Sequence, residues 1–293
     1  MTHSDKIVVF GEVLFDCFPS GEKVLGGAPF NVAWHLQALG DAPLFVSRIG
    51  EDADGAAITR AMEEWGLDTS GVQRDPARPT GSVQIALQDG EPHYTLTPDV
   101  AYDFIEKMAR PPVTDAPLVY HGSLALRNPV SRATCKALTE WPGAQVFVDV
   151  NLRAPWWSRQ AVMDDLQRAR WAKLNVDELR ALGFDQAEAD DALRALQSAT
   201  GVHQVILTRG KQGAAVLTAD GQVEHVPPAP LERRVDPVGA GDAFSAIYLH
   251  GLLAGWPVRR SVERAQEFAA CIISQRGATP QDRALYAPHR TDA

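Results

Sequence analysis

The stretch DPVGAGDAF, Asp236 to Phe244, places small residues directly before an acidic residue and a long apolar segment. The apolar residues after it recur at helical spacing and stop near Gly255 and Pro257, so a helix is predicted to begin beside the glycines. The unpaired N–H groups at a helix start attract an anion, and glycines let a phosphate approach the backbone closely. The stretch therefore predicts an anion-binding helix start.

Asp242 would lie beside that anion, with its carboxylate free to accept a proton from an incoming hydroxyl. Phosphoryl transfer needs this combination of a base and an anion site. Helix capping and dipole preferences select the same pattern, so the motif alone leaves a catalytic site and a structural helix start both open.

The 293 residues suit one large α/β domain, which we expect to span residues 1–293. A hydrophobic fraction of 45%, a charged fraction of 22% and a net charge of −9 are typical of a globular protein and argue against a nucleic-acid partner.

Neither a signal pattern nor a membrane-spanning run is found, so we expect no membrane contact and a cytoplasmic location. The three cysteines, Cys17, Cys135 and Cys271, lack C-x-x-C spacing and are expected to be reduced thiols.

Short runs rich in Val, Ile and Phe alternate along the chain with segments of helical period. The strand candidates are KIVVF (6–10), PLFVSRIG (43–50), PLVYHGSL (117–124), QVFVDVN (145–151), WAKLNV (171–176) and QVILTRG (204–210). The helix candidates include PFNVAWHLQALG (29–40), GAAITRAMEEWG (55–66), PVSRATCKALTEW (129–141) and NVDELRALG (175–183). This alternation predicts an α/β fold with a mostly parallel sheet covered by helices on both faces.

Two segments depart from that pattern by alternating apolar and polar residues. They span about residues 12–25 and 81–98 and are expected to turn at Ser20-Gly21 and Asp89-Gly90. We predict that these half-exposed hairpins form one small sheet that stands off the main domain.

A second cluster, GGAPFNVA (26–33) with Gly40 and Gly50 after it, precedes DPVGAGDAF by some two hundred residues. The two motifs together resemble the two signatures of the PfkB family of ribokinase-like sugar kinases. The segments GEVLFD, GGAPFN, GSLALRN and DVNLR look most like those of the fructokinases. The resemblance implies a three-layer α/β/α fold in which a small β-sheet lid covers the sugar.

For the transferred phosphate and the sugar, the resemblance implies the following roles. Asp242 would be the general base, and the backbone of Gly239, Ala240 and Gly241 would form the anion hole for the γ-phosphate of ATP. Gly26, Gly27 and Asn31 would hold sugar hydroxyls, and Asp16 would accept two more. From the residues alone, GGAPFN could be an ordinary helix start and Asp16 a solvated surface charge.

For the nucleotide, NVDE matches a family motif whose members organise Mg²⁺ through water, which implies that role for Asn175 and Glu178. The same spacing is also close to a capping box, and both roles can hold at once. TRGKQG implies that Thr208 and Gly210 contact ATP and that Gly213 permits a turn; it does not match a Walker loop.

Three more residues are candidates by resemblance. Arg153 in DVNLR and Arg127 in GSLALRN are donors suited to a phosphate or a polar sugar group, with surface ion pairs as the alternative. Asp236, with nearby carbonyls, would border a potassium site, although Pro237-Val238 replaces a pair that is Thr-rich in many members. His93 and His121 are expected to be structural.

The sequence thus predicts ATP-dependent phosphorylation of a primary hydroxyl on a small sugar, with D-fructose first and a sugar acid such as 2-keto-3-deoxygluconate second. A non-catalytic sugar-binding or partner-binding relative stays open, and so does a dinucleotide-dependent oxidoreductase, although no G-x-G-x-x-G follows the first strand. The apolar half of the lid hairpins needs a cover, which predicts a homodimer formed through the lids.

Overall fold

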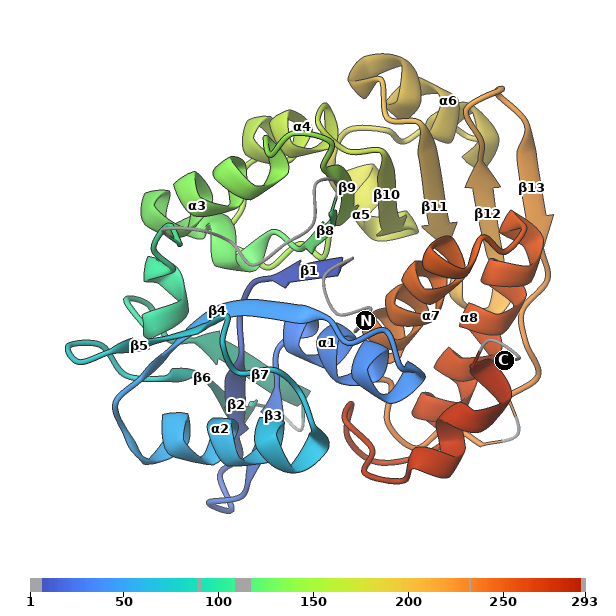
Figure 1. Cartoon of the computed structure of the whole chain (residues 1–293). Coiled ribbons are helices and arrows are strands. Elements are labelled where there is room, and N and C mark those ends of the chain that lie inside the picture. Colours follow the sequence, from blue (N-terminus) through green and yellow to red (C-terminus); the bar gives the residue numbers. More distant parts are fainter. Residues whose placement is uncertain (1–6, 89–90, 109–116, 232, 291–293) are drawn as a thin grey trace.

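The computed structural model describes residues 7–88, 91–108, 117–231 and 233–290. Its main sheet has nine strands in the order β13-β12-β11-β10-β9-β8-β1-β4-β5 (Figure 1). The strands are β1 (Ile7–Phe10), β4 (Leu44–Gly50), β5 (Val72–Asp75), β8 (Leu118–His121), β9 (Gln145–Asp149), β10 (Trp171–Asn175), β11 (Gln204–Thr208), β12 (Ala214–Leu217) and β13 (Val223–Val226). Neighbouring strands from β11 to β5 are parallel, whereas β12 and β13 continue the sheet in antiparallel pairs.

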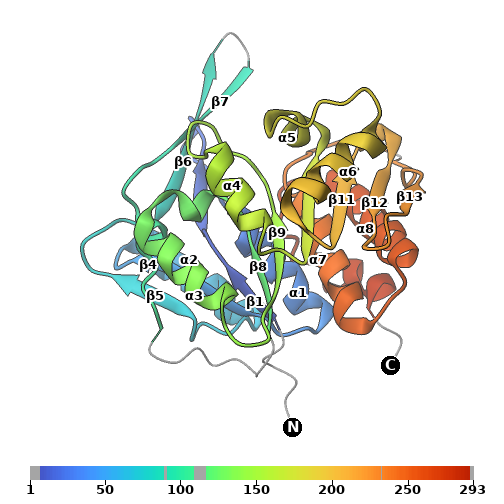
Figure 2. The same cartoon turned by 90° about the horizontal axis from the view of Figure 1, so that it is seen from above.

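Helices cover both faces of this sheet (Figures 1 and 2). They are α1 (Ala28–Leu39), α2 (Ala53–Trp65), α3 (Pro129–Thr139), α4 (Arg159–Leu166), α5 (Val176–Ala181), α6 (Ala189–Thr200), α7 (Ala240–Ala254) and α8 (Val258–Ile273), with short 3₁₀ helices η1 (Ala101–Phe104), η2 (Leu124–Arg127), η3 (Gly210–Gln212) and η4 (Arg283–His289). Alternate strand residues enter different cores: Val9 packs with side chains of α1, α2, α7 and α8, whereas Val8 packs with side chains of α3. The predicted three-layer architecture is therefore confirmed.

Each predicted strand lies in the main sheet, and each predicted helix is present with slightly different ends. The strand candidates did not include β5, β12 or β13. These strands are four residues long, and β5 has the sequence VQRD, in which only the first residue is apolar. So short a segment carries no detectable period, and pairing with the sheet decides its conformation.

The small sheet, called the lid below, contains β2 (Leu14–Cys17), β3 (Lys23–Gly26), β6 (Gly81–Gln88) and β7 (Glu91–Leu96) in the order β3-β2-β6-β7. Its two antiparallel hairpins are joined by parallel pairing of β2 with β6, which places Asp16 opposite Val83. The first hairpin turns as predicted, with Gly21 at a φ of 85° and its N–H donating to the Phe18 carbonyl. The predicted turn at Asp89-Gly90 lies outside the described residues.

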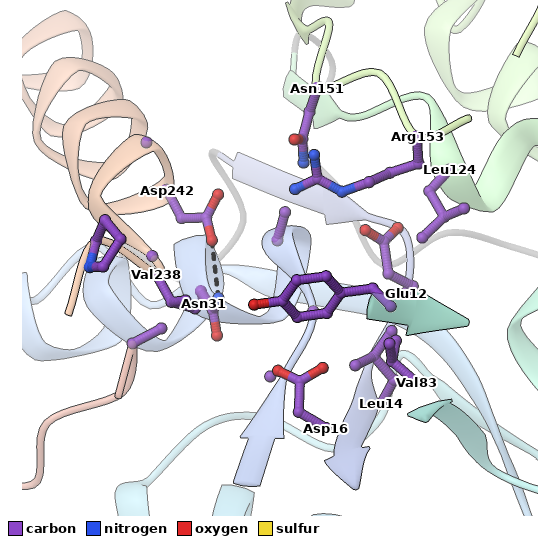
Figure 3. A pocket seen from close by; sticks show the side chains of 18 of the residues that line it. Glu12, Leu14, Asp16, Asn31, Val83, Leu124, Asn151, Arg153, Val238 and Asp242 are labelled. Atoms are coloured by element: carbon purple, nitrogen blue, oxygen red, sulfur yellow. Dashed lines mark hydrogen bonds between the residues drawn. The ribbon is translucent and has the colours of Figure 1, made fainter. Parts of the chain in front are cut away.

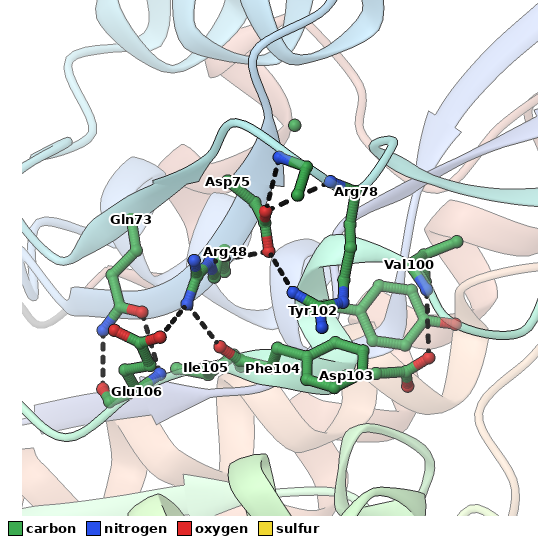
Figure 4. A network of polar contacts seen from close by, with 12 residues as sticks. Arg48, Gln73, Asp75, Arg78, Val100, Tyr102, Asp103, Phe104, Ile105 and Glu106 are labelled. Carbon is green, nitrogen blue, oxygen red and sulfur yellow. Dashed lines mark hydrogen bonds and ion pairs between the residues drawn. The ribbon is translucent and has the colours of Figure 1, made fainter.

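A polar network around the buried Arg48–Asp75 pair joins the segment after β7 to the main sheet (Figure 4). Arg48 of β4 contacts the Asp75 carboxylate at 3.1 Å and the Glu106 carboxylate at 2.9 Å, and it donates to the Phe104 carbonyl at 2.8 Å. The guanidinium of Arg78 lies 3.4 Å from the Phe104 ring centroid. The segment that follows β7 is thereby fixed to the ends of β4 and β5.

Among the described residues, none of the helices combines the length and the apolar character needed to cross a bilayer.

Candidate active site

A cavity of about 590 Å³ lies where the carboxyl ends of the parallel strands face the lid (Figure 3). Ligands of open α/β sheets gather at this end of the strands. Most of the predicted site residues line it: Asp16, Gly26, Gly27, Asn31, Arg153, Asn175, Glu178, Thr208, Asp236, Gly239, Gly241 and Asp242. The structure therefore brings together residues from both sequence motifs and from the strand ends between them.

The glycine motif forms the start of α7. Gly239 caps the helix with a φ of 80°, and a Cβ at this position would collide with Ala278. Ala240 is the first helical residue, and its N–H has only a long contact of 3.4 Å with the Pro237 carbonyl. At Gly241 a Cβ would point into the cavity side of the helix, 3.2 Å from the Lys173 amine. The start of this 15-residue helix can accept an anion at its N–H groups, with the positive end of the dipole directed at it.

Asp242 lies in the first turn of α7 and accepts a hydrogen bond of 2.8 Å from the Asn31 amide on α1. Burial raises the pKa of Asp242 to about 6, and the Asn31 hydrogen bond opposes that rise. A carboxylate with this pKa is ionised at neutral pH and is a better proton acceptor than an exposed aspartate. Asp242 therefore has the position and the basicity of a general base next to the helix start.

A buried ion pair lies beneath the same helix start. The Lys173 amine on β10 lies 2.8 Å from the Asp149 carboxylate at the end of β9, and the Ser245 hydroxyl donates to that carboxylate at 2.7 Å. Burial alone would lower the pKa of Lys173, but the Asp149 carboxylate beside it raises the pKa above its ordinary value. Lys173 thus stays charged and places a cation beside Gly241, at the predicted anion site.

The lid side of the cavity carries the predicted sugar-binding residues. Asp16 on β2 is half-buried, and this burial raises the pKa of its carboxyl group. Gly27 caps α1 with a φ of 110°, and a Cβ there would lie 2.7 Å from the Glu12 carbonyl, so only glycine fits. Gly26 is less constrained, because its Cβ would meet only the Asp16 carboxylate at 3.5 Å.

Asn175 and Glu178 form the capping box that their spacing indicates. The Asn175 side chain accepts from the Glu178 N–H at 2.9 Å, and the Glu178 carboxylate accepts from the N–H groups of Asn175 at 2.8 Å and Leu152 at 3.0 Å. Burial raises the pKa of Glu178, and the nearby Asp149 raises it further. Each Glu178 oxygen keeps a lone pair for water, so the pair fits an indirect role at a metal ion, and that role stays a prediction.

Four predicted residues do not line the cavity. Ala240 lies between Gly239 and Gly241, which do line it, while Gly210 (φ 53°) and Gly213 (φ 80°) shape the turn after β11 and leave Thr208 as the part of TRGKQG that reaches it. Arg127 pairs with Asp103 at 2.6 Å and donates to the Thr97 carbonyl at 2.6 Å. The role of Arg127 in binding substrate stays a prediction, and the contacts described here place it at the base of the lid.

Arg153, the predicted donor for a phosphate or sugar group, and Asp236, the predicted potassium-site residue, both line the cavity. The side chain of Arg153 donates to the neighbouring Leu152 carbonyl at 3.3 Å. The carboxylate of Asp236 accepts from the N–H groups of Val238 at 3.0 Å and Gly277 at 3.2 Å, so it shapes the loop before α7.

His121 is buried against its own strand end, with Nδ1 3.0 Å from the Gly122 carbonyl, and His93 is exposed on the lid.

Sequence reasoning did not single out Glu12, Asp149 and Lys173, although all three line the cavity. Two signals could have identified the ion pair, because Asp149 and Lys173 are charged residues within otherwise apolar strand candidates, and a charge in a buried strand needs a partner. Glu12 directly follows the first strand at the edge where ligands bind.

Comparison with known proteins agrees with this geometry. The pfkB family of carbohydrate kinases matches residues 4–284 of the chain. Fructokinase of Escherichia coli is 30% identical over 301 residues, which cover 94% of this chain and 95% of that protein.

Two solved structures are also similar. Fructokinase from Vibrio cholerae O395 with fructose, ADP and calcium ion bound has a TM-score of 0.83 at 26% identity and covers 97% of this chain and 99% of that one. Aminoimidazole riboside kinase from Salmonella enterica, complexed with aminoimidazole riboside and an ATP analogue, has a TM-score of 0.82 at 25% identity and covers 97% of this chain and all of that one.

Such kinases are phosphotransferases that act on an alcohol group, and the match extends over both sequence motifs and nearly all of the folded chain. The family match, the shared ribokinase-like fold and the arrangement of Asp242 beside the glycine helix start lead to one assignment: the chain belongs to the pfkB family of carbohydrate kinases.

Proposed function

We propose that this kinase transfers the γ-phosphate of ATP to a primary hydroxyl of a small sugar, and that the sugar is D-fructose. The observation that carries the proposal is the position of Asp242, which is half-buried, bonded to Asn31 at 2.8 Å and one residue from the glycine helix start. A base and an anion site in one cavity are what transfer from ATP to an alcohol requires.

In the proposed reaction, Asp242 takes the proton of the sugar hydroxyl while the hydroxyl oxygen forms its bond to the γ-phosphorus and the bond to ADP breaks. The N–H groups at the start of α7 and the Lys173 amine stabilise the negative charge on the transferred group. Asn31 orients Asp242 through their hydrogen bond. Mg²⁺ would offset phosphate charge when bound with ATP, and Asn175 and Glu178 would hold it through water.

Fructose is favoured over a sugar acid by the charges around the cavity. The acidic side chains Glu12, Asp16 and Asp242 line it and would repel a sugar carboxylate. Of the basic residues in the lining, Lys173 is paired with Asp149 and Arg276 with Glu22, which leaves Arg153 as the one without an ion pair among the described residues. Lys23 of the lid does not line the cavity and is paired with Asp54 at 2.7 Å. The fructokinases among the relatives support the same choice.

A neutral riboside is a second candidate, because the aminoimidazole riboside kinase shares the fold at a TM-score of 0.82. Such a substrate would extend past the sugar toward the lid, where Tyr94 lines the cavity and is 56% exposed. Aromatic side chains of this kind can stack on a planar base.

Three further proposals concern a potassium ion, the oligomeric state and the location of the protein in the cell. Potassium would bind near Asp236, and the potassium-bound form of a Vibrio cholerae fructokinase double mutant supports testing it. The exposed Tyr94 on the edge strand β7 supports a homodimer through the lids. A cytoplasmic location is proposed from the sequence.

A coupled assay of ATP consumption tests the function, with fructose, ribose, glucose, tagatose, adenosine, aminoimidazole riboside and 2-keto-3-deoxygluconate as acceptors. Each would be measured with magnesium and with or without potassium. We expect turnover with fructose at a kcat/KM at least about tenfold above the other acceptors, which corresponds to one well-placed hydrogen bond. Preference for another acceptor would discard fructose, and no turnover with any acceptor would contradict the proposed function.

A further inference from the structure

Glu12 is a buried acid that the proposed reaction does not use. It follows β1, lines the cavity and is 3% exposed, and its Oε2 atom has no hydrogen-bond partner among the described residues. A buried acceptor without a partner is costly and rare in folded proteins. An unpaired acid within a binding cavity is expected to find its partner in the ligand.

The position of Glu12 fits contact with a different part of the sugar from the reacting hydroxyl. Figure 3 shows Asp242 and Asn31 on one side of the cavity and Glu12 on the other, near Arg153 and Leu124. Among the described side chains, Glu12 and Arg153 do not form an ion pair, for which a carboxylate oxygen and a guanidinium nitrogen must lie within 4.0 Å of each other. The space between the two sides is therefore bounded by separate polar groups that a polyhydroxylated ligand can bridge.

The surroundings of Glu12 constrain its backbone and place polar groups near its carboxyl. Its backbone is packed against Gly27, where a Cβ would come within 2.7 Å of the Glu12 carbonyl. Two more buried polar atoms have no partner among the described residues, Tyr102 Oη and Arg127 Nη1. The charge of Arg127 lowers the pKa of Glu12, and the charge of Glu12 raises the pKa of Tyr102. Arg127 is itself fixed by Asp103 at 2.6 Å.

Burial raises the pKa of Glu12 to about 7, while a hydrogen bond from its own backbone N–H and the charge of Arg153 oppose the rise and the charge of Asp242 adds to it. Near neutral pH such a carboxyl group can donate one hydrogen bond or accept several. Both forms suit a sugar hydroxyl, which is itself a donor and an acceptor, whereas an ionised carboxyl would repel an acidic substrate.

We propose that Glu12 is a further substrate-binding residue, whose carboxyl group hydrogen-bonds a hydroxyl of the sugar on the side of the cavity opposite Asp242. The proposal rests on the proposed function, because it requires a sugar in this cavity. It adds a contact that selects neutral polyhydroxylated sugars and does not take part in proton transfer.

The test compares Glu12→Gln, which keeps the shape, and Glu12→Met, which removes the polar group, with the wild-type protein. Sugar binding is measured by calorimetry with fructose, and turnover by the coupled assay. We expect Glu12→Met to lose about 10- to 100-fold in fructose affinity, the loss expected for one strong hydrogen bond. Glu12→Gln should lose less, because its amide can still donate and accept. KM for ATP should change less than about twofold in both variants. We also expect kcat at saturating fructose to fall less than about tenfold, because Glu12 does not touch the transferred proton.

Thermal unfolding separates this role from a structural one. Removing an unpaired buried acid relieves a cost in the free protein, so the unfolding midpoint of Glu12→Met should rise by about 2 °C or more while affinity falls. Asp165→Asn is the matched control, because Asp165 is a buried acid on α4 that pairs with Arg132 outside this cavity. It should lower the midpoint and leave fructose affinity unchanged.

Unchanged fructose affinity in both Glu12 variants would overturn the inference while the proposed function stands. So would a lowered unfolding midpoint in both variants, because weaker binding would then follow from damage to the fold. A wild-type protein that phosphorylates no acceptor in the panel would instead overturn the proposed function, and this inference with it.

Discussion

The Asn31 amide donates a hydrogen bond of 2.8 Å to the Asp242 carboxylate, across a separation of 211 residues in the chain. The bond joins the first turn of α1 to the first turn of α7, and these helices pack side by side (Figure 1). Each of the two sequence motifs therefore supplies one partner of the bond. The orientation and the basicity of Asp242 both depend on it.

Asp242→Asn should lower kcat by roughly 10²- to 10⁴-fold, because it removes the proton acceptor. Fructose affinity, measured by calorimetry without ATP, should change little, since the asparagine has nearly the same size and can still bond to residue 31. A variant that keeps most of its turnover would remove Asp242 from the mechanism.

The rate should depend on pH through the same carboxyl group. Its pKa of about 6 predicts that kcat declines as the pH falls below 6, because the protonated acid cannot accept the hydroxyl proton. The Asn31 hydrogen bond favours the charged form, so Asn31→Ala should move this decline to higher pH. Profiles of kcat from pH 5 to pH 9 for the wild type and Asn31→Ala would show this shift. If the decline at low pH stays at the same pH in the variant, a group other than Asp242 causes it.

Stability should also depend on pH, with a sign set by the raised pKa values. Asp242 is shifted from 3.8 to about 6 and Glu12 from 4.5 to about 7, so the folded protein binds protons more tightly than the unfolded chain. Proton binding by these two groups therefore stabilises the fold fully below their unfolded-state pKa values of 3.8 and 4.5, and this stabilisation is lost as the pH rises through about 6 to 7. Urea unfolding should therefore show a smaller decrease from pH 5 to pH 8 in Glu12→Met than in the wild type.

The two glycines at the start of α7 should differ when replaced. Gly239→Ala should destabilise the fold by about 1–3 kcal/mol, because its φ is positive and the Cβ would meet Ala278. Gly241→Ala should leave the unfolding midpoint almost unchanged, since its conformation is helical and the nearest contact is the end of the Lys173 side chain. Turnover should fall in both variants, and an active Gly241→Ala protein would argue against phosphate binding at this position.

Arg127 tests whether a residue at the lid base acts on substrate or on folding. Arg127→Met should lower the free energy of unfolding by about 3–5 kcal/mol, because it leaves the buried Asp103 carboxylate without its partner. The double variant Arg127→Met with Asp103→Asn should recover part of that loss. A large rise in the KM for fructose at unchanged stability would instead support the substrate contact that the sequence predicts.

Much of the fold followed from the sequence because most strands of the main sheet are short apolar runs and the helices between them repeat apolar residues at helical period. The lid was equally visible, since half-exposed hairpins alternate apolar and polar residues. The order of the strands and the parallel pairing of β2 with β6 were not predictable, because contacts between segments about sixty residues apart leave no local pattern.

The candidate site was predictable where motifs carry it, as at Asp242 and Asn31. The Lys173–Asp149 pair could not be assigned from sequence, because each residue looks like an isolated charge until β9 and β10 are placed side by side. Arg127 shows the opposite limit: its motif was recognisable, but only the three-dimensional arrangement shows Asp103 and the Thr97 carbonyl holding its side chain.

The lid is built from two stretches of chain that meet only through the pairing of β2 with β6. A chimera that grafts one hairpin from a relative would set a foreign strand against a native one, in a register that neither sequence was selected for. Exchange of sugar preference between members of this family should therefore require transplanting both hairpins together, along with the Arg48, Asp75 and Arg127 anchors beneath them.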